Sequence, residues 1–390
     1  MDFFESDDSI FNLDDVAGKV EPFLGNEFKP WHKPRKQYIR EKQWLEQLLK
    51  TLKASQYNGI STINYFGLPG GDLLDVNHLR SGMLNSKRAK NKFLSVHGFV
   101  NDLSDYQRAQ ASMSKFLDNK NVSQLSKVEN FSFESLGKLD SDAWKRVKSF
   151  GHYHFVNLDF CNNMLSEKTL TSMYYFLDYQ LKRVVGLPWI LCITTRLNKE
   201  SASLGIITKF EGLMAEIKCD GDVSLALEEC FGEAFKTIVS MESLSNLDNK
   251  KVMNQLLQIC LVLWFVDETL KNGCEISLKS SFKYSVDLFN PELDMHSFVF
   301  KIMNVDVIKP DNLGLIDVGS ATVSPKKSTM DYKKDALNKL SESLDVDKYL
   351  ESNLDELELY VNKILELLST CGYDVSEYRK TMNEKYGYKL

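Results

Sequence analysis

The segment with the clearest chemical meaning is Ile63–Gly71, which reads Ile-Asn-Tyr-Phe-Gly-Leu-Pro-Gly-Gly. A β-rich run leads into its glycines at Ser61–Phe66, and a helix can begin at Asp72 or Asp75. In open α/β sheets, ligands bind where a strand ends and its helix begins, and glycine lets the backbone approach a ligand closely. We therefore expect this loop to line a cleft at the carboxyl edge of a mainly parallel sheet. The alternative is a sharp strand-to-helix turn without a ligand.

The same segment resembles the first motif of class I S-adenosylmethionine-dependent methyltransferases. More narrowly, it is similar to the D-x-F-A-G-P-G variant of DNA methyltransferases and of methyltransferase-like proteins from bacterial defence loci. The matching residues are Phe66, Gly67, Pro69, Gly70 and Gly71, whereas Asn64 replaces the usual acid and Leu68 replaces a small residue. The resemblance implies a Rossmann-like fold with S-adenosylmethionine as a possible cofactor, held at Asn64, Phe66, Gly67, Pro69 and Gly70. Other doubly wound folds carry similar loops and remain the alternative.

Two acids further along occupy positions that the resemblance assigns to the cofactor. Asp102 follows the β-rich run Phe93–Val100, where the family carries an acid that holds the ribose hydroxyls. Glu134 follows the third β-rich run, where such proteins often contact the adenine. Asp102 could equally cap the helix predicted at Ser104–Leu117, and Glu134 could be a solvated loop residue. Both are candidates for the cofactor site.

The fourth β-rich run, His154–Leu158, is followed by Asp159-Phe160-Cys161-Asn162. In amino-methyltransferases this place carries an acid or amide, two prolines, and an aromatic residue that stacks on the target base. The resemblance therefore assigns the catalytic positions to Asp159 and Phe160, although Asp159 could instead be a carboxylate satisfied by loop amides. Both prolines are missing, which favours a methyltransferase-like protein with degenerate catalytic motifs, associated with nucleic acid or with a defence complex. The alternative is an active S-adenosylmethionine-dependent methyltransferase on DNA or RNA.

Other common chemistries lack their motifs. The seven cysteines are an odd number without a C-x-x-C pair, which indicates a reducing compartment, no disulfide framework and no zinc site. The chain contains neither a G-x-x-x-x-G-K-[ST] phosphate-binding loop nor an H-E-x-x-H zinc motif, so we expect no metal. Cys161 and Cys192 lie at predicted strand ends, and His152 and His154 could supply a base, but buried cysteine is usually inert.

A basic segment at residues 29–53 precedes the first strand. Its cations are interleaved with Trp31, His32 and Tyr38, and this pattern fits contact with phosphates and unpaired bases. The residues predicted to bind nucleic acid, or else an acidic partner surface, are Lys33, Arg35, Lys36 and Arg40. One alternative is a solvated amphipathic helix whose aromatic residues pack on the domain. Another is that the acidic arm at residues 1–27 covers the patch.

The overall composition excludes a globally basic nucleic-acid binder. The chain has 390 residues, is 43% hydrophobic and carries a formal net charge of -6. This length predicts two domains, or one large domain with additions. The acidic N-terminus argues against a signal peptide, and the most apolar stretch, Leu256–Val266, is shorter than the ~20 residues that cross a bilayer. We therefore expect a cytoplasmic protein that does not enter a membrane.

Strands alternate with helices through the first half, which predicts an α/β fold with a doubly wound, mainly parallel sheet. We expect an acidic arm and basic helix at residues 1–54, a methyltransferase-like domain at 55–310, and a helical insertion within it at 220–272. Two alternating runs at 275–287 and 295–305 predict an antiparallel hairpin that ends the sheet.

A C-terminal helical segment is predicted at 329–390, after a turn-rich linker. Within residues 331–370, an apolar stripe recurs at helical spacing. It consists of Leu357, Val361, Ile364 and Leu368. We predict that this segment is an interaction element for a partner protein or a second copy. The alternative is that the stripe packs on the protein's own core.

Overall fold

The computed structural model of this protein describes residues 27–232, 235–236, 249–286, 289, 293–304 and 327–390. In this part of the chain, eight strands form one sheet in the order β3-β2-β1-β4-β5-β7-β6-β8. The strands are β1 (Thr62–Gly67), β2 (Phe93–Phe99), β3 (Lys127–Glu129), β4 (Phe155–Asn163), β5 (Pro188–Arg196), β6 (Cys274–Tyr284), β7 (Met295–Asn304) and β8 (Leu344–Asp345). The pairs among β1 to β5 are parallel, whereas β7 runs antiparallel to both β5 and β6. The predicted doubly wound, mainly parallel sheet is confirmed, and so is the antiparallel hairpin.

This strand order, with an antiparallel β7 between β5 and β6, is that of the Rossmann-like methyltransferase fold. The order reverses between β1 and β4, because β2 and β3 lie on one side of β1 and the later strands lie on the other. Open sheets bind their ligands at such a topological switch point. The fold therefore places the loop after β1 where the sequence predicted a cleft.

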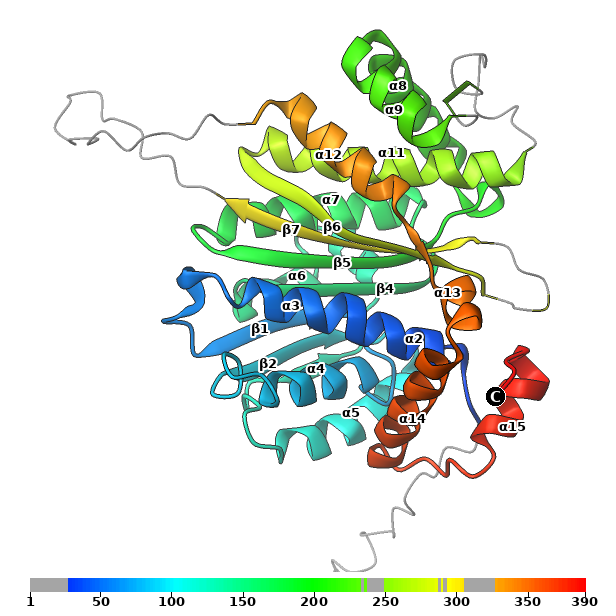
Figure 1. Ribbon diagram of the computed structural model, residues 1–390. Helices are drawn as coiled ribbons and strands as arrows, with labels where there is room; N and C mark the ends of the chain where they lie inside the picture. Colours follow the sequence, from blue (N-terminus) through cyan, green and yellow to red (C-terminus); the bar gives the residue numbers. More distant parts are fainter. Residues whose placement is uncertain (1–26, 233–234, 237–248, 287–288, 290–292, 305–326) are drawn as a thin grey trace, which may run out of the picture.

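Two helical layers cover the sheet, each with its own apolar core. One layer contains α2 (Pro34–Ile39), the π-helical turn η2 (Arg40–Leu45), α3 (Glu46–Thr51), α4 (Leu74–Leu84), α5 (Leu103–Leu117), α13 (Val346–Ser352), α14 (Leu354–Thr370) and α15 (Tyr378–Tyr386). The other contains α6 (Asp142–Phe150), α7 (Glu167–Arg183), α8 (Leu204–Cys219), α9 (Gly221–Phe231), α11 (Lys250–Lys271) and α12 (Thr329–Ser341). Figure 1 shows α2, α3 and α4 in front of the sheet and α6 and α7 behind it. Four short 3-10 turns complete the described chain: η1 (Pro30–His32), η3 (Ser55–Tyr57), η4 (Phe133–Gly137) and η5 (Lys199–Ser201).

The N-terminal helix and the C-terminal segment belong to the core of the central domain and are not separate units. Tyr38 and Trp44 pack in the first core together with the whole C-terminal stripe, whose four residues are at most 6% exposed. α14 lies against α2 and α4, and α12 lies against β6 and α11. The apolar stripe thus packs on the protein's own core, as the alternative stated, because this face is already removed from water within the chain. Binding of a partner through another face of residues 331–370 stays a prediction.

The helical insertion differs from its predicted limits. It was expected at 220–272, but in the structure α8 already begins at Leu204, and α9 and α11 follow it. The apolar stretch Leu256–Val266 lies inside α11 and is buried except for Trp264, which is partly exposed. Among the described helices, none is both long enough and apolar enough to cross a bilayer. Most of the turn between the two runs of the predicted hairpin, nearly all of the acidic arm and most of the predicted linker lie outside the described residues.

Candidate ligand site at the carboxyl edge of the sheet

A cavity of about 350 Å³ lies beyond the carboxyl ends of β1, β2 and β4. The loops that follow β1, β2, β3 and β4 all contribute to its lining, and Trp31 of η1 borders it. Pockets that hold small molecules in proteins have volumes of ~300–1,000 Å³. Because this cavity also lies at the topological switch point, it is the candidate ligand site.

The loop after β1 approaches the cavity through its backbone. Pro69 and Gly70 line the cavity, and a Cβ atom added at Gly70 would meet no other atom within 4 Å. Behind them, glycine is required at Gly98 of β2, because a Cβ there would lie 2.7 Å from the Pro69 ring. The loop ends at Leu73, whose backbone adopts the left-handed conformation with φ of 51°. The loop is thus pressed against β2 and leaves open space above Gly70.

Three of the residues that the resemblance placed at the cofactor do not line this cavity. Asn64 lies in the middle of β1, and its side chain donates to the His152 carbonyl (3.0 Å) on the amino side of β4. Phe66 is fully buried in the second core. Gly67 leaves no room for a ligand, since a Cβ there would lie 2.8 Å from the Asn157 carbonyl oxygen. These residues support the loop and do not face the site.

The two predicted cofactor acids do line the cavity, and both are also engaged with the protein. Asp102 caps α5 by accepting a hydrogen bond from the Asp105 amide (2.9 Å), as the capping alternative predicted. Glu134 accepts a hydrogen bond from the Thr169 hydroxyl (3.0 Å). Each carboxylate is therefore held in a fixed position on the wall, and a ligand would meet it without further ordering.

The two predicted catalytic residues also lie on the cavity wall, at the end of β4. Asp159 accepts a hydrogen bond from the Lys36 ammonium, with 2.7 Å between Oδ1 and Nζ. Burial raises the pKa of the Asp159 carboxyl, and the Lys36 charge opposes this effect. Phe160 packs edge-on against Phe133, with 5.4 Å between ring centroids. The side chains of Cys161 and Asn162 lie outside the described part of the structure.

The four cations predicted to bind nucleic acid are buried, with at most 5% of each residue exposed. Lys33 donates to the Val286 carbonyl, and Lys36 is held by Asp159 as described above. Arg35 makes a two-pronged ion pair with Asp347, at 2.8 and 2.9 Å. Arg40 binds Asp75 (2.6 Å) and also donates to the Trp31 carbonyl.

This burial corrects the prediction that Lys33, Arg35, Lys36 and Arg40 form a basic surface patch, whereas Lys42, Lys50 and Lys53 of the same segment are exposed. A charge taken out of water must be paired inside the protein. Carboxylates of this chain pair with Arg35, Lys36 and Arg40, and a backbone carbonyl accepts from Lys33. These four cations therefore hold the N-terminal helix to the rest of the fold. They do not provide the exposed charge on which the nucleic-acid prediction depended.

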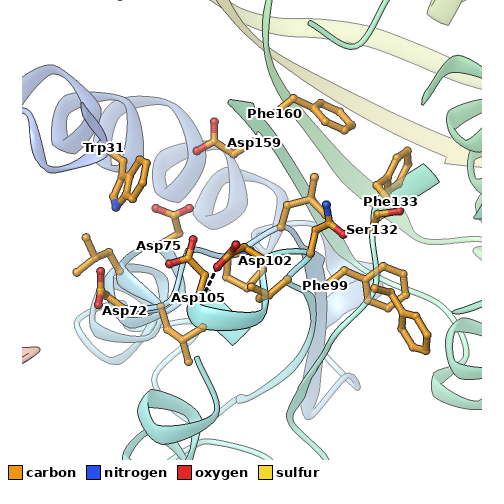
Figure 2. A pocket seen from close by; sticks show the side chains of 18 of the residues that line it. Trp31, Asp72, Asp75, Phe99, Asp102, Asp105, Ser132, Phe133, Asp159 and Phe160 are labelled. Atoms are coloured by element: carbon orange, nitrogen blue, oxygen red, sulfur yellow. Dashed lines mark hydrogen bonds between the residues drawn. The ribbon is translucent and has the colours of Figure 1, made fainter. Parts of the chain in front are cut away.

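Sequence reasoning missed four of the residues that shape the cavity: Trp31, Asp72, Asp75 and Asp105. Figure 2 shows Asp75, Asp102, Asp105 and Asp159 directed toward a common space, with Trp31 on one side and aromatic rings on the other. The three missed acids lie in or next to the first turn of α4 or α5, where acids are common for capping reasons alone. The sequence therefore held no signal that set them apart.

The cavity is strongly acidic. Six carboxylates line it, whereas Arg40 is its only cationic lining residue among the described ones. Lys36 and Arg108 lie close behind, paired with Asp159 and Asp105.

Asp72 accepts a hydrogen bond from the Tyr373 hydroxyl (2.7 Å). Burial raises the pKa of Asp72, but His32 and Tyr373 together lower this pKa below its ordinary value. Within the described residues, no three side chains form a metal-binding group. The site suits a ligand that carries positive charge and an aromatic ring.

A family model described as PP_RS20740-like matches residues 25–383 of the chain. No curated protein matches it significantly. Among solved structures, the chain is similar to a loganic acid methyltransferase determined with SAH, at 10% identity over 88% of this chain and 92% of that one, with a TM-score of 0.32. It is also similar to the methyltransferase domain of bacterial CtHen1-C, at 13% identity over 68% and 99% of the two chains, with a TM-score of 0.31. A precorrin-6y C5,15-methyltransferase from Geobacter metallireducens GS-15 gives 8% identity over 67% and 87%, with a TM-score of 0.29. Similarities this distant do not locate a site.

Proposed function

We propose that this chain, which belongs to the PP_RS20740-like family, holds S-adenosylmethionine in the cavity at the carboxyl edge of its sheet. The observation that supports this most is the order of the loops around one cavity. The loop after β1 contributes Pro69 and Gly70, the loop after β2 contributes Asp102, and Glu134 follows β3. This is the order in which the resemblance assigns backbone, ribose and adenine contacts.

The chemistry of the lining fits that ligand. S-adenosylmethionine carries a sulfonium and an α-ammonium group, and six carboxylates surround the space. Trp31 and Phe99 present aromatic rings, which attract a cation and can stack on an adenine. Asp102 would hold the ribose hydroxyls, and Glu134 would lie near the adenine. The open space above Gly70 would admit the ligand next to the backbone.

The part of the cavity at the end of β4, where a methyl acceptor would bind, supports a degenerate catalytic centre. An acid that accepts hydrogen bonds from a target amine needs its oxygens directed at that amine. Here Asp159 already accepts from the buried Lys36 ammonium, which takes the place of an external amine at Oδ1. The two prolines of the family motif are absent after Asp159. We therefore propose a methyltransferase-like protein that binds the cofactor but does not methylate an adenine amine.

Calorimetric titration with S-adenosylmethionine and with S-adenosylhomocysteine tests the binding step. The variant Gly70→Leu fills the open space above the loop and should weaken binding by at least about tenfold, or ~1.4 kcal/mol. Gly59→Leu is the matched control, because a Cβ at Gly59 also meets no atom within 4 Å but lies outside the cavity. The proposal fails if the wild-type protein binds neither compound, or if Gly70→Leu binds as well as Gly59→Leu.

A second candidate is an active methyltransferase on DNA or RNA. The observation in its favour is that Asp159 and Phe160 line the cavity and are not buried away from it. Transfer of a labelled methyl group to DNA or RNA oligonucleotides, lost in Asp159→Asn, would establish this candidate over the first. Association with nucleic acid or with a defence complex stays a prediction from the sequence.

A further inference from the structure

A second cavity, of about 400 Å³, lies on the opposite face of the sheet from α2. It is lined by the end of α9, the start of α11, the adjoining ends of β6 and β7, and the residues at the end of α12. Its polar lining includes Lys251, Asn254, Gln258, Lys283, His296 and Ser343. Among the described residues, no carboxylate lines this cavity. It is therefore opposite in charge to the acidic cavity.

A buried histidine without a well-aligned hydrogen bond faces this cavity. His296 is 3% exposed, and neither of its ring nitrogens makes a well-aligned hydrogen bond within the described part of the protein, although the Leu293 backbone lies close to the ring. Burial lowers its pKa to about 3, so the ring is neutral at physiological pH and offers one donor and one acceptor. An unpaired buried polar group is unfavourable, and a ligand in the cavity would satisfy it.

Three lysines line the cavity, and Lys250 pairs with Glu200 (3.6 Å). The other two, Lys283 of β6 and Lys251 of α11, make no ion pair with any described residue. The first turn of α11 contains no acid and begins with Lys250 and Lys251. Positive charge at a helix N-terminus opposes the helix dipole, whereas an anion there is stabilised by it. This 22-residue helix thus begins at the cavity, with Lys251 in its first turn.

The cavity lies at the same edge of the sheet as the acidic site. His296 pairs with Thr195 of β5, and the neighbouring residue Thr194 pairs with Asp159 of β4. Two strand spacings of ~4.8 Å separate these positions across the sheet, or about 10 Å. Because side chains alternate along a strand, His296 faces the layer of α11, whereas Asp159 faces the layer of α2.

We propose that this second cavity binds a phosphorylated small molecule, whose phosphate lies between Lys283, Lys251 and the N-terminus of α11. His296 and the Gln258 amide would contact the same ligand deeper in the cavity. A volume of about 400 Å³ exceeds the needs of a phosphate alone and admits an attached group such as a nucleoside. This inference does not depend on S-adenosylmethionine binding in the acidic cavity.

Calorimetric titration of the full chain with inorganic phosphate and with adenosine monophosphate tests this site. We expect binding of adenosine monophosphate that Lys283→Gln weakens by at least tenfold. Lys279→Gln is the matched control, since Lys279 lies four residues earlier on β6, is exposed and lines no part of the cavity. Thermal unfolding of both variants checks that they are folded.

Two results would overturn the inference: no binding of either compound at millimolar concentration, or binding that Lys283→Gln and Lys279→Gln leave equally unchanged. Binding of inorganic phosphate with the same dependence on Lys283, but no gain from the nucleoside, would assign the site to a phosphate group alone and overturn the larger ligand. Titration with S-adenosylmethionine is measured separately, so failure of one proposal is distinguishable from failure of the other.

Discussion

The acidic cavity and the basic cavity lie at the same edge of one sheet, yet the charged side chains around them differ in sign and in how they are paired. Around the acidic cavity, three of the carboxylates are paired with cations of the same chain, through Lys36, Arg40 and Arg108. Around the basic cavity, Lys250 pairs with Glu200, whereas Lys251 and Lys283 have no carboxylate partner among the described residues. The comparison shows that charge near a cavity can belong to the fold or be left for a ligand, and that the pairing decides which.

The paired charges of the acidic cavity also join distant parts of the chain. Lys36 links the N-terminal helix to the end of β4, and Arg40 links it to the first turn of α4. Arg40 also donates to the Trp31 carbonyl, so the same guanidinium positions the aromatic residue at the rim of the cavity. Stability and site geometry are therefore coupled on this side. On the basic side, the described ion pair is that of Lys250 at the start of α11 with Glu200 of η5, and it involves neither Lys251 nor Lys283.

The largest expected effect comes from breaking the pair beneath the acidic cavity. Lys36→Met keeps the length and apolar stem of the side chain but leaves Asp159 buried without its cation. We expect the free energy of unfolding in urea at neutral pH to fall by ~3–5 kcal/mol, the cost of an unpaired buried charge. The loss should shrink as pH falls from the raised folded-state pKa of the unpaired carboxyl toward the ordinary Asp value of 3.8, and it should be gone below that value, because a buried unpaired carboxyl binds its proton more tightly in the folded state than in the unfolded state.

The double variant Lys36→Met, Asp159→Asn is the control for this pair. It removes both charges, so it should recover most of the lost stability. If Lys36→Met is as stable as the wild-type protein, the pair is not part of the fold, and the contrast between the two cavities disappears.

At the basic cavity we expect a smaller change in the free energy of unfolding, with the opposite sign. His296→Leu removes a buried imidazole that makes no well-aligned hydrogen bond among the described residues and should stabilise the protein by ~1–2 kcal/mol at pH 7. The gain should grow as pH falls from 6.5 toward about 3, because a histidine with a folded-state pKa of about 3 makes the wild-type protein less stable once the unfolded state takes up the proton.

His154→Leu is the matched control for that variant. Burial also lowers the pKa of His154 to about 3, but its Nδ1 accepts a hydrogen bond from the Asn64 amide (2.9 Å). This substitution should therefore destabilise the protein at pH 7, where His296→Leu stabilises it. Two histidines with similar burial would then be separated by hydrogen bonding alone. A destabilising His296→Leu would mean that the ring is satisfied within the chain.

The sequence supported the fold better than the site, for physical reasons. Alternation of apolar runs with helices reflects local periodicity, and it predicted the sheet, the hairpin and the loop before α4 correctly. The fate of Arg35 could not be predicted in this way, because its partner Asp347 lies 312 positions away. The sequence pattern of a basic amphipathic helix is the same whether its cations are exposed to water or paired with buried carboxylates. Asn64 was expected at the cofactor, but it lies too early on β1 for its side chain to reach the carboxyl edge, which is a more local reason.

The smallest expected effect on stability separates the two roles of Asp102. Its carboxylate caps α5 and also lines the acidic cavity. Asn caps helices about as well as Asp, so Asp102→Asn should change the free energy of unfolding by less than ~0.5 kcal/mol. A contact to the ribose hydroxyls would lose its charge, however, and affinity for S-adenosylmethionine should fall about tenfold. S-adenosylhomocysteine, which shares the ribose, should lose the same factor. Asp220→Asn changes the cap of α9 in the same way, outside the cavity, and should leave both affinities unchanged. Equal affinities in the two variants would assign Asp102 to capping alone and would leave the acidic cavity without its predicted ribose contact.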